Sequence, residues 1–150
     1  YSSAAFDADD QLHVAYQSFS GNDLLYKNVT TGLREVVDTG YRVVGTTEDG
    51  LPKPELHFVG ADTQIIMTSN GPAVVHQDST SQELVLARRT TNGWESEILA
   101  GNAEPYAGAY GFFAAAAAFG DDIIAGSYVI FQAENDQWVE LHRTSSGGVE

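Results

Sequence analysis

Alternating apolar and polar residues predict short β-strands along most of the chain. Residues 11–19 alternate and are rich in leucine, valine, tyrosine and phenylalanine, a pattern typical of a strand with one buried face. Turn sequences such as Asn92-Gly93, a strong hairpin signal, separate such segments. The predicted strands are 3–6, 11–19, 24–29, 33–37, 64–68, 73–77, 84–89, 94–99, 112–119, 123–132 and 137–143. About eleven strands with frequent turns, and no convincing helix, predict an all-β protein.

Residues 114–118 are the one place where helix propensity competes with this interpretation. They are consecutive alanines, and alanine is the best helix former. The run is short, however, and lies between glycines and phenylalanines at a position where the strand pattern requires an inner strand. Small side chains suit a crowded inner strand, so we predict a strand here.

The chain also repeats itself with a period near sixty residues. Residues 24–31 recur as 84–91, and Gln17 recurs as Gln77. A weaker third copy begins near Trp138. Repeats of this length built from strands predict blades or stacked β-units. We divide the chain into a first unit (1–40), an irregular surface loop (41–60), a second unit (61–104) and an incomplete third unit (105–150).

Composition narrows the range of partners. The net charge is −14, with 21 acidic residues against 7 basic ones, and Arg88-Arg89 is the one adjacent basic pair. Nucleic acids and anionic membranes need clustered Lys and Arg, so both are excluded as expected partners. The absence of cysteine excludes a disulfide framework, a thiol nucleophile and cysteine-ligated metals. No apolar run approaches the roughly 20 residues of a membrane span, so we expect no membrane insertion.

The first unit carries a recognisable motif. Residues 2–17, which include His13-Val14-Ala15-Tyr16, are followed by Asp23-Leu24-Leu25-Tyr26. This succession resembles the repeats of bacterial extracellular β-propellers, although Asp10 stands where that family usually has glycine. The resemblance implies a partial propeller of about three four-stranded antiparallel blades. Because a ring needs at least four blades, it also implies that further blades, another polypeptide chain or self-association completes the ring.

From this resemblance we expect an extracellular or periplasmic module that binds protein or carbohydrate without catalysis. Two alternatives stay open. The chain could be part of a propeller glycoside hydrolase whose carboxylates lie partly on other blades, or a structural subunit of a larger envelope assembly. The sequence assigns no catalytic residue: Thr91-Asn92-Gly93-Trp94 is similar to a sialidase Asp-box but lacks its Asp.

Few residues qualify as ligand-binding candidates. Aromatic rings that could stack on a sugar are Trp94, Trp138, Tyr106 and Tyr110, although both tryptophans also suit packing between blades. Asp7, Asp9 and Asp10 share one turn and could supply carboxylate oxygens to calcium, the single possible cofactor. The alternative is that these residues simply form the turn.

The sequence contains two further features that could indicate a functional site. Asp38-Thr39-Gly40 resembles the aspartic protease motif, but Tyr41-Arg42 follows it, and the repeat explains Gly40 as the turn that matches Gly101. The four histidines lack the short spacing of known metal sites, so we expect structural roles for them.

Overall fold

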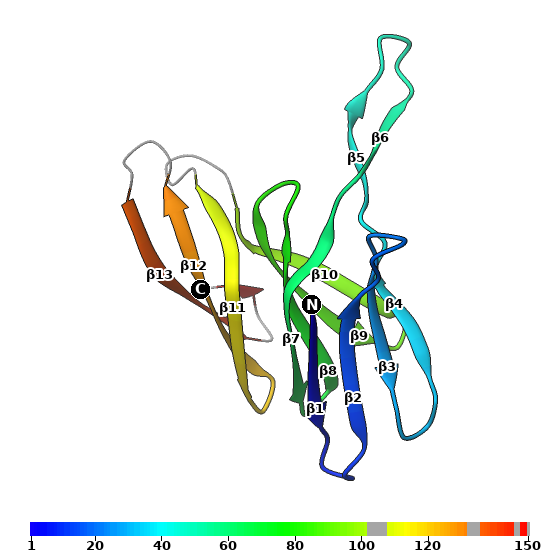
Figure 1. Ribbon diagram of the computed structural model, residues 1–150, viewed down its shortest axis with the longest axis vertical. Helices are drawn as coiled ribbons and strands as arrows, with labels where there is room; N and C mark the ends of the chain where they lie inside the picture. Colours follow the sequence, from blue (N-terminus) through cyan, green and yellow to red (C-terminus); the bar gives the residue numbers. More distant parts are fainter. Residues whose placement is uncertain (102–107, 132–135, 146–147, 150) are drawn as a thin grey trace.

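The computed structural model describes residues 1–101, 108–131, 136–145 and 148–149, and the protein is all-β within these ranges (Figure 1). Sheet 1 consists of β1 (Ser2–Phe6), β2 (Leu12–Gln17), β3 (Leu24–Asn28) and β4 (Arg34–Asp38). Sheet 2 consists of β7 (Val59–Thr68), β8 (Gly71–Asp78), β9 (Glu83–Thr90) and β10 (Gly93–Ala100). Sheet 3 consists of β11 (Ala109–Phe119), β12 (Asp122–Phe131), β13 (Asp136–Ser145) and β14 (Gly148–Val149).

Each of these sheets is an antiparallel meander in which every strand pairs with the next strand along the chain. All eleven predicted strands are therefore confirmed, with modest changes at their ends. Three strands were not predicted: β14, and the pair β5 (Tyr41–Thr46) and β6 (Pro52–Leu56). Meanders of this kind follow directly from strands joined by tight turns.

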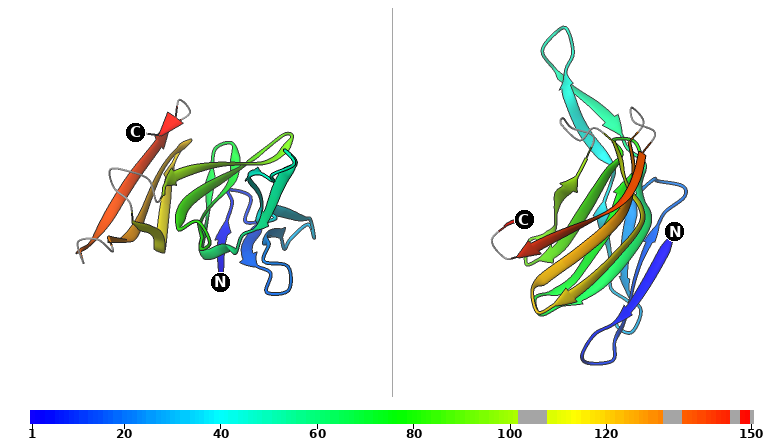
Figure 2. Two further views of the ribbon diagram at one scale, coloured as in Figure 1. Left: turned by 90° about the horizontal axis from the view of Figure 1, so that it is seen from above. Right: turned by 90° about the vertical axis from the view of Figure 1, so that its left-hand side faces the viewer.

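The three sheets lie face to face, with sheet 2 in the middle (Figure 2). One face of sheet 2 packs on sheet 1 through a cluster that contains Leu24, Tyr26 and Val74. Its other face packs on sheet 3 through a cluster that contains Leu86 and Val129. Alternating side chains on sheet 2 thus serve two separate cores.

The first strands of the sheets lie next to one another, since β7 contacts both β1 and β11. The predicted strand at the alanine run is confirmed within β11. Ala114, Ala116 and Ala118 point toward sheet 2 and pack on its core. Their small side chains allow β11 to lie close to β7, β8 and β9, so packing outweighs helix propensity here.

The prediction of an irregular loop over 41–60 was wrong. β5 and β6 pair as an antiparallel hairpin, in which Tyr41 lies opposite Leu56 and Val43 lies opposite Pro54. This hairpin, which we call the arm, projects away from the three sheets (Figure 1). Every residue of β6 is exposed, so the arm is held at its base.

Two sheet faces at the ends of the stack are exposed and apolar. On sheet 3, the face turned away from sheet 2 presents Phe113, Ile124, Val139 and Leu141. On sheet 1, the face turned away from sheet 2 presents apolar side chains that include Phe6 and Val36. Large exposed apolar patches on a soluble protein mark interaction surfaces.

Candidate functional site

The tryptophan in the second unit is a packing residue. Trp94 donates from its indole nitrogen to Glu35 Oε2 at 2.9 Å, and its ring lies 5.3 Å from that of Tyr26. Arg89 donates two hydrogen bonds to the same carboxylate, each 2.8 Å long. The arginine hydrogen bonds, followed by the indole hydrogen bond, hold the pKa of Glu35 below its usual value despite partial burial. Trp94 therefore joins sheet 1 to sheet 2, and the prediction that it binds a ligand is not supported.

The two other aromatic candidates that the structure describes, Tyr110 and Trp138, both contact the ring of Phe131. Tyr110 is 3% exposed and belongs to the core between sheets 2 and 3, which contradicts a stacking role. Trp138 packs on Phe131, with ring centroids 4.1 Å apart, and is partly exposed. Tyr106 lies outside the described residues. Burial against sheet 2 thus leaves Tyr110 little surface for a sugar, whereas Trp138 keeps part of its ring exposed.

Among the three aspartates of the first turn, Asp7 makes contacts within the protein, while Asp9 and Asp10 are exposed. Asp7 Oδ1 accepts hydrogen bonds from the backbone N–H groups of Asp9 and Gln11, and its Oδ2 lies 3.0 Å from His13 Nε2. The Gln11 N–H and the His13 ring lower the pKa of Asp7. Among the residues that the structure describes, no group of three or more His, Asp or Glu side chains could hold a metal ion. Asp7 thus forms the turn, the alternative weighed above.

His13 has the structural role that was expected of it. Its Nδ1 lies 2.7 Å from the hydroxyl of Tyr26, which is itself buried. Because Asp7 can only accept, we assign the proton to His13 Nε2, so that Nδ1 accepts from the tyrosine. Burial raises the pKa of Tyr26. The contact ties the first turn to the core of sheet 1.

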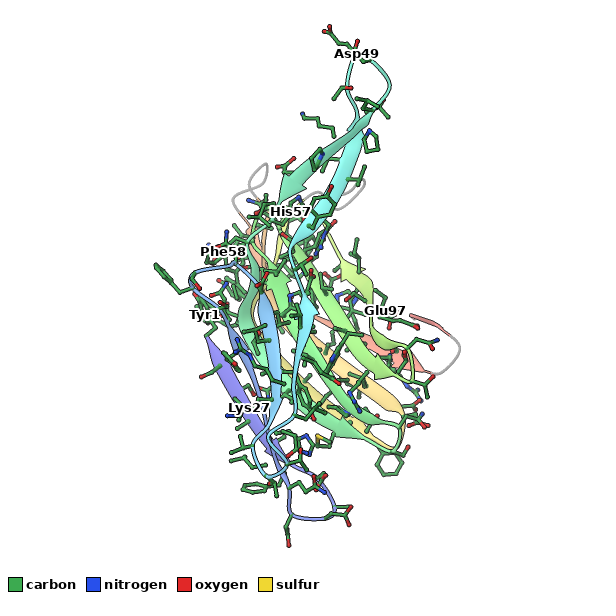
Figure 3. The ribbon with its side chains drawn as sticks, turned by 90° about the vertical axis from the view of Figure 1, so that its right-hand side faces the viewer. Tyr1, Lys27, Asp49, His57, Phe58 and Glu97 are labelled. Carbon is green, nitrogen blue, oxygen red and sulfur yellow. The ribbon has the colours of Figure 1, made fainter. Side chains whose placement is uncertain are left out.

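A buried polar cluster at the base of the arm was not predicted. It consists of Asp38, Arg42, His57, His76 and Asp78, which come from four different parts of the chain. Asp38 ends β4 and Asp78 ends β8, while the other members lie on β5, after β6 and on β8. In Figure 3, His57 lies at the base of the arm and Asp49 at its tip.

Arg42 connects the two carboxylates of the cluster. Its guanidinium donates to both oxygens of Asp38 at 2.9 and 2.7 Å, and to Asp78 Oδ2 at 3.3 Å. Asp38 is 8% exposed and Asp78 is fully buried. Burial alone would raise the pKa of Asp38, but the Arg42 guanidinium and the Gly40 N–H together hold it below its usual value. Asp38 is therefore a charged anchor of the cluster.

The histidines complete the cluster. His57 Nδ1 lies 2.8 Å from Asp78 Oδ2, and its backbone N–H donates to the carbonyl of Gly40. His76 is fully buried, and its Nδ1 accepts from the N–H of Gly60 at 3.3 Å. We therefore place the His76 proton on Nε2, which has no hydrogen-bond partner and lies 3.9 Å from Asp38 Oδ2. Burial lowers the pKa of His76, so the ring is neutral at pH 7.

A pocket of about 410 Å³ opens beside the polar cluster, between β4 and the outer strands of sheet 2. Asp38 and Arg42 line it from one side, and Glu83, Ser96 and Glu97 line it from the other. The polar atoms of Asp38 and Arg42 already bind each other, so they offer little to a further ligand. The cluster is therefore best understood as the attachment of the arm to sheets 1 and 2.

An apolar hollow lies on the exposed face of sheet 3. This groove has a volume of about 440 Å³, and its lining includes Phe113, Ala115, Ile124, Tyr128, Val139 and Leu141. Phe113 has a φ of 51°, unusual for a bulky residue, and its N–H donates to Asp62 Oδ2 at 2.8 Å. The hydrogen bond to Asp62, on β7, thus holds the backbone at Phe113, one side of the groove, against sheet 2.

The sequence carries a signal for this surface. Residues 112–119 and 123–132 are apolar on both faces of the predicted strands, and a strand with a solvated face would alternate. The described part of the chain contains no helix that could span a membrane. No protein-family model matches the chain, and no curated protein or solved structure is similar enough to it to indicate a relationship.

Proposed function

We propose that this chain is a sector of a β-propeller and acts as a non-catalytic protein-binding module outside the cytoplasm, in the extracellular space or the cell envelope. Three consecutive four-stranded meanders, stacked face to face with β1, β7 and β11 adjacent, support the blade interpretation. The acidic, cysteine-free composition and the motif around His13 are consistent with a secreted propeller.

One observation carries the proposal: the exposed face of sheet 3 presents a group of large apolar side chains. Leu141 is 70% exposed and Val139 is 67% exposed, beside Phe113 and Ile124. Burial of such side chains contributes roughly 25 cal/mol per Å² of apolar surface, so this face gains from being covered.

A protein is a better partner than a carbohydrate. Sugar sites need exposed aromatic rings, and two of the aromatic candidates, Trp94 and Tyr110, are engaged in contacts between sheets, while Trp138 is partly exposed. Three sheets do not close a ring, so further blades or another polypeptide would supply the cover. If the polypeptide that covers this face is bound permanently, the chain is a structural subunit of an envelope assembly. The same apolar face favours this alternative.

The proposal can be tested by placing a photo-crosslinking amino acid at position 141, with the exposed turn residue Phe19 as the control position. We expect adducts to polypeptide at position 141, mapped by mass spectrometry to defined peptides, and none at position 19. Equal adducts at both positions, or none at position 141, would contradict the proposal. Selective binding of the chain to a glycan array would contradict the preference for protein.

A further inference from the structure

At both junctions between sheets, a glutamine of the earlier sheet donates a hydrogen bond to the first strand of the later sheet. Gln17, at the end of β2, donates its side-chain amide to the carbonyl of Val59 on β7 at 2.7 Å. Gln77, at the end of β8, donates in the same way to Tyr110 on β11 at 2.5 Å. In both cases the second strand of one sheet is joined to the first strand of the following sheet.

A glycine follows each acceptor and permits the close approach. Gly60 has a φ of 84° and Gly111 a φ of 86°. A side chain on Gly111 would meet Gln77 Cβ at 2.9 Å, and one on Gly60 would meet Leu24 Cβ at 3.2 Å. The same junction therefore occurs twice in the molecule. We call the face of a sheet that is turned toward the following sheet its front face, and the face turned toward the preceding sheet its rear face.

This polarity leaves one front face and one rear face exposed among the described residues. The exposed front face belongs to sheet 3 and includes Phe113, Val139 and Leu141. The exposed rear face belongs to sheet 1 and includes Phe6, of which 66% is exposed, and Val36. A further sheet that packs on either face extends the stack in the orientation of the two internal junctions.

We propose that the front face of sheet 3 binds the rear face of sheet 1 of a second copy of this chain. The inference rests on the proposed function and names its partner. Both junctions within the chain pair a front face with a rear face, so a front-to-front contact has no precedent in the molecule. Such a head-to-tail contact is heterologous and generates a ring or an open series of copies.

Electrostatic repulsion opposes the association of two copies, and the cations of the rear face lessen it. Each copy has a net charge of −14, so two copies repel each other at long range. The rear face of sheet 1 carries the exposed side chains of Lys27 and Arg34, which lie opposite each other on β3 and β4. These cations reduce the repulsion where an acidic second copy approaches. Added salt screens the remaining repulsion, so association should strengthen with ionic strength.

The test uses two variants that each block one face. Phe6→Glu places a carboxylate on the rear face, and Leu141→Glu places one on the front face. Both side chains are mostly exposed, so neither substitution buries a charge in the folded chain. Leu51→Glu, on the exposed turn of the arm, is the matched control. Masses are measured by native mass spectrometry and sedimentation, and folding is checked by circular dichroism.

We expect wild type and Leu51→Glu to form oligomers at raised concentration, and each face variant alone to be a monomer. A mixture of the two face variants should form dimers and stop at two copies, because one intact front face meets one intact rear face. A monomeric wild type would overturn the inference, as would dimerisation of Phe6→Glu alone or loss of assembly in Leu51→Glu. If the wild type is monomeric but position 141 crosslinks to a different polypeptide, the inference fails while the proposed function stands.

Discussion

Replacement of Arg42 by methionine tests whether the polar cluster holds the arm. The substitution removes the one cation that binds both Asp38 and Asp78, two carboxylates that are almost completely buried. Removing one partner of a buried ion pair typically costs about 3–5 kcal/mol, because an uncompensated charge stays in the interior. We expect a loss of about this size in the free energy of unfolding at pH 7, measured by urea denaturation.

The pH dependence of the loss separates electrostatics from packing. In the wild type the pKa of Asp38 lies below its ordinary value of 3.8, so the pair stabilises the fold above that pH and loses its effect as the pH falls through the folded value. Without Arg42, burial raises the Asp38 pKa, and a proton neutralises the carboxylate at mildly acidic pH. The destabilisation by Arg42→Met should therefore be smaller at pH 4.5 than at pH 7.

Arg143→Met is the matched control, because Arg143 pairs with Asp122 at 2.7 Å on the surface, where 58% of its side chain is exposed. Its loss should cost at most about 1 kcal/mol. Amide exchange adds a local measurement: Arg42→Met should speed exchange within 41–56 more than elsewhere. Equal effects of the two substitutions, or a pH-independent loss at Arg42, would refute the reasoning.

Three further predictions concern the core and the joints between sheets. Gly111→Ala should lower the free energy of unfolding, measured by thermal or urea unfolding, by about 2–4 kcal/mol, because the new side chain sits on a left-handed backbone and clashes with Gln77. Gly120→Ala, where φ is 62° and no atom lies near the new Cβ, should lower it by only about 1–2 kcal/mol. In a spectrophotometric titration, a phenol that ionises above the ordinary value of 10 should be lost in Tyr26→Phe, since burial raises the Tyr26 pKa; an unchanged curve would contradict that assignment. The pKa of Glu35 lies below its ordinary 4.5, so its stabilisation is present above pH 4.5 and lost at lower pH, and Glu35→Gln should flatten the acid limb of the stability curve.

The strands could be predicted because each sheet uses the same local pattern. Residues 11–19 and 84–89 have apolar side chains at the positions that face a neighbouring sheet, and tight turns bound them. The arm could not be predicted in this way. Both faces of β6 are exposed, so no buried face imposes an alternation, and Pro52 and Pro54 remove the usual strand signature.

The polar cluster escaped prediction for a different reason. Asp38 and Asp78 look like turn residues in the sequence, since each follows an apolar strand and precedes a small polar residue. Their burial depends on the arm, which brings Arg42 and His57 to them from a segment without a pattern. For Trp94 the packing alternative was available from the repeat and proved to be the right one.

The two prolines of β6 limit the hydrogen bonds that the exposed edge of the arm can offer to another strand. The His57 N–H donates to Gly40, so the alternation along the hairpin turns the nitrogen of Pro54, opposite Val43, toward the outer edge. The Thr47 N–H donates to Leu51, which turns the nitrogen of Pro52 the same way. An unfolded segment or a stray strand that meets this edge finds no N–H donor at either proline, which disfavours extension of the hairpin on the β6 side into a cross-β stack. The prolines therefore protect the β6 edge of a protruding, partly apolar hairpin against strand addition.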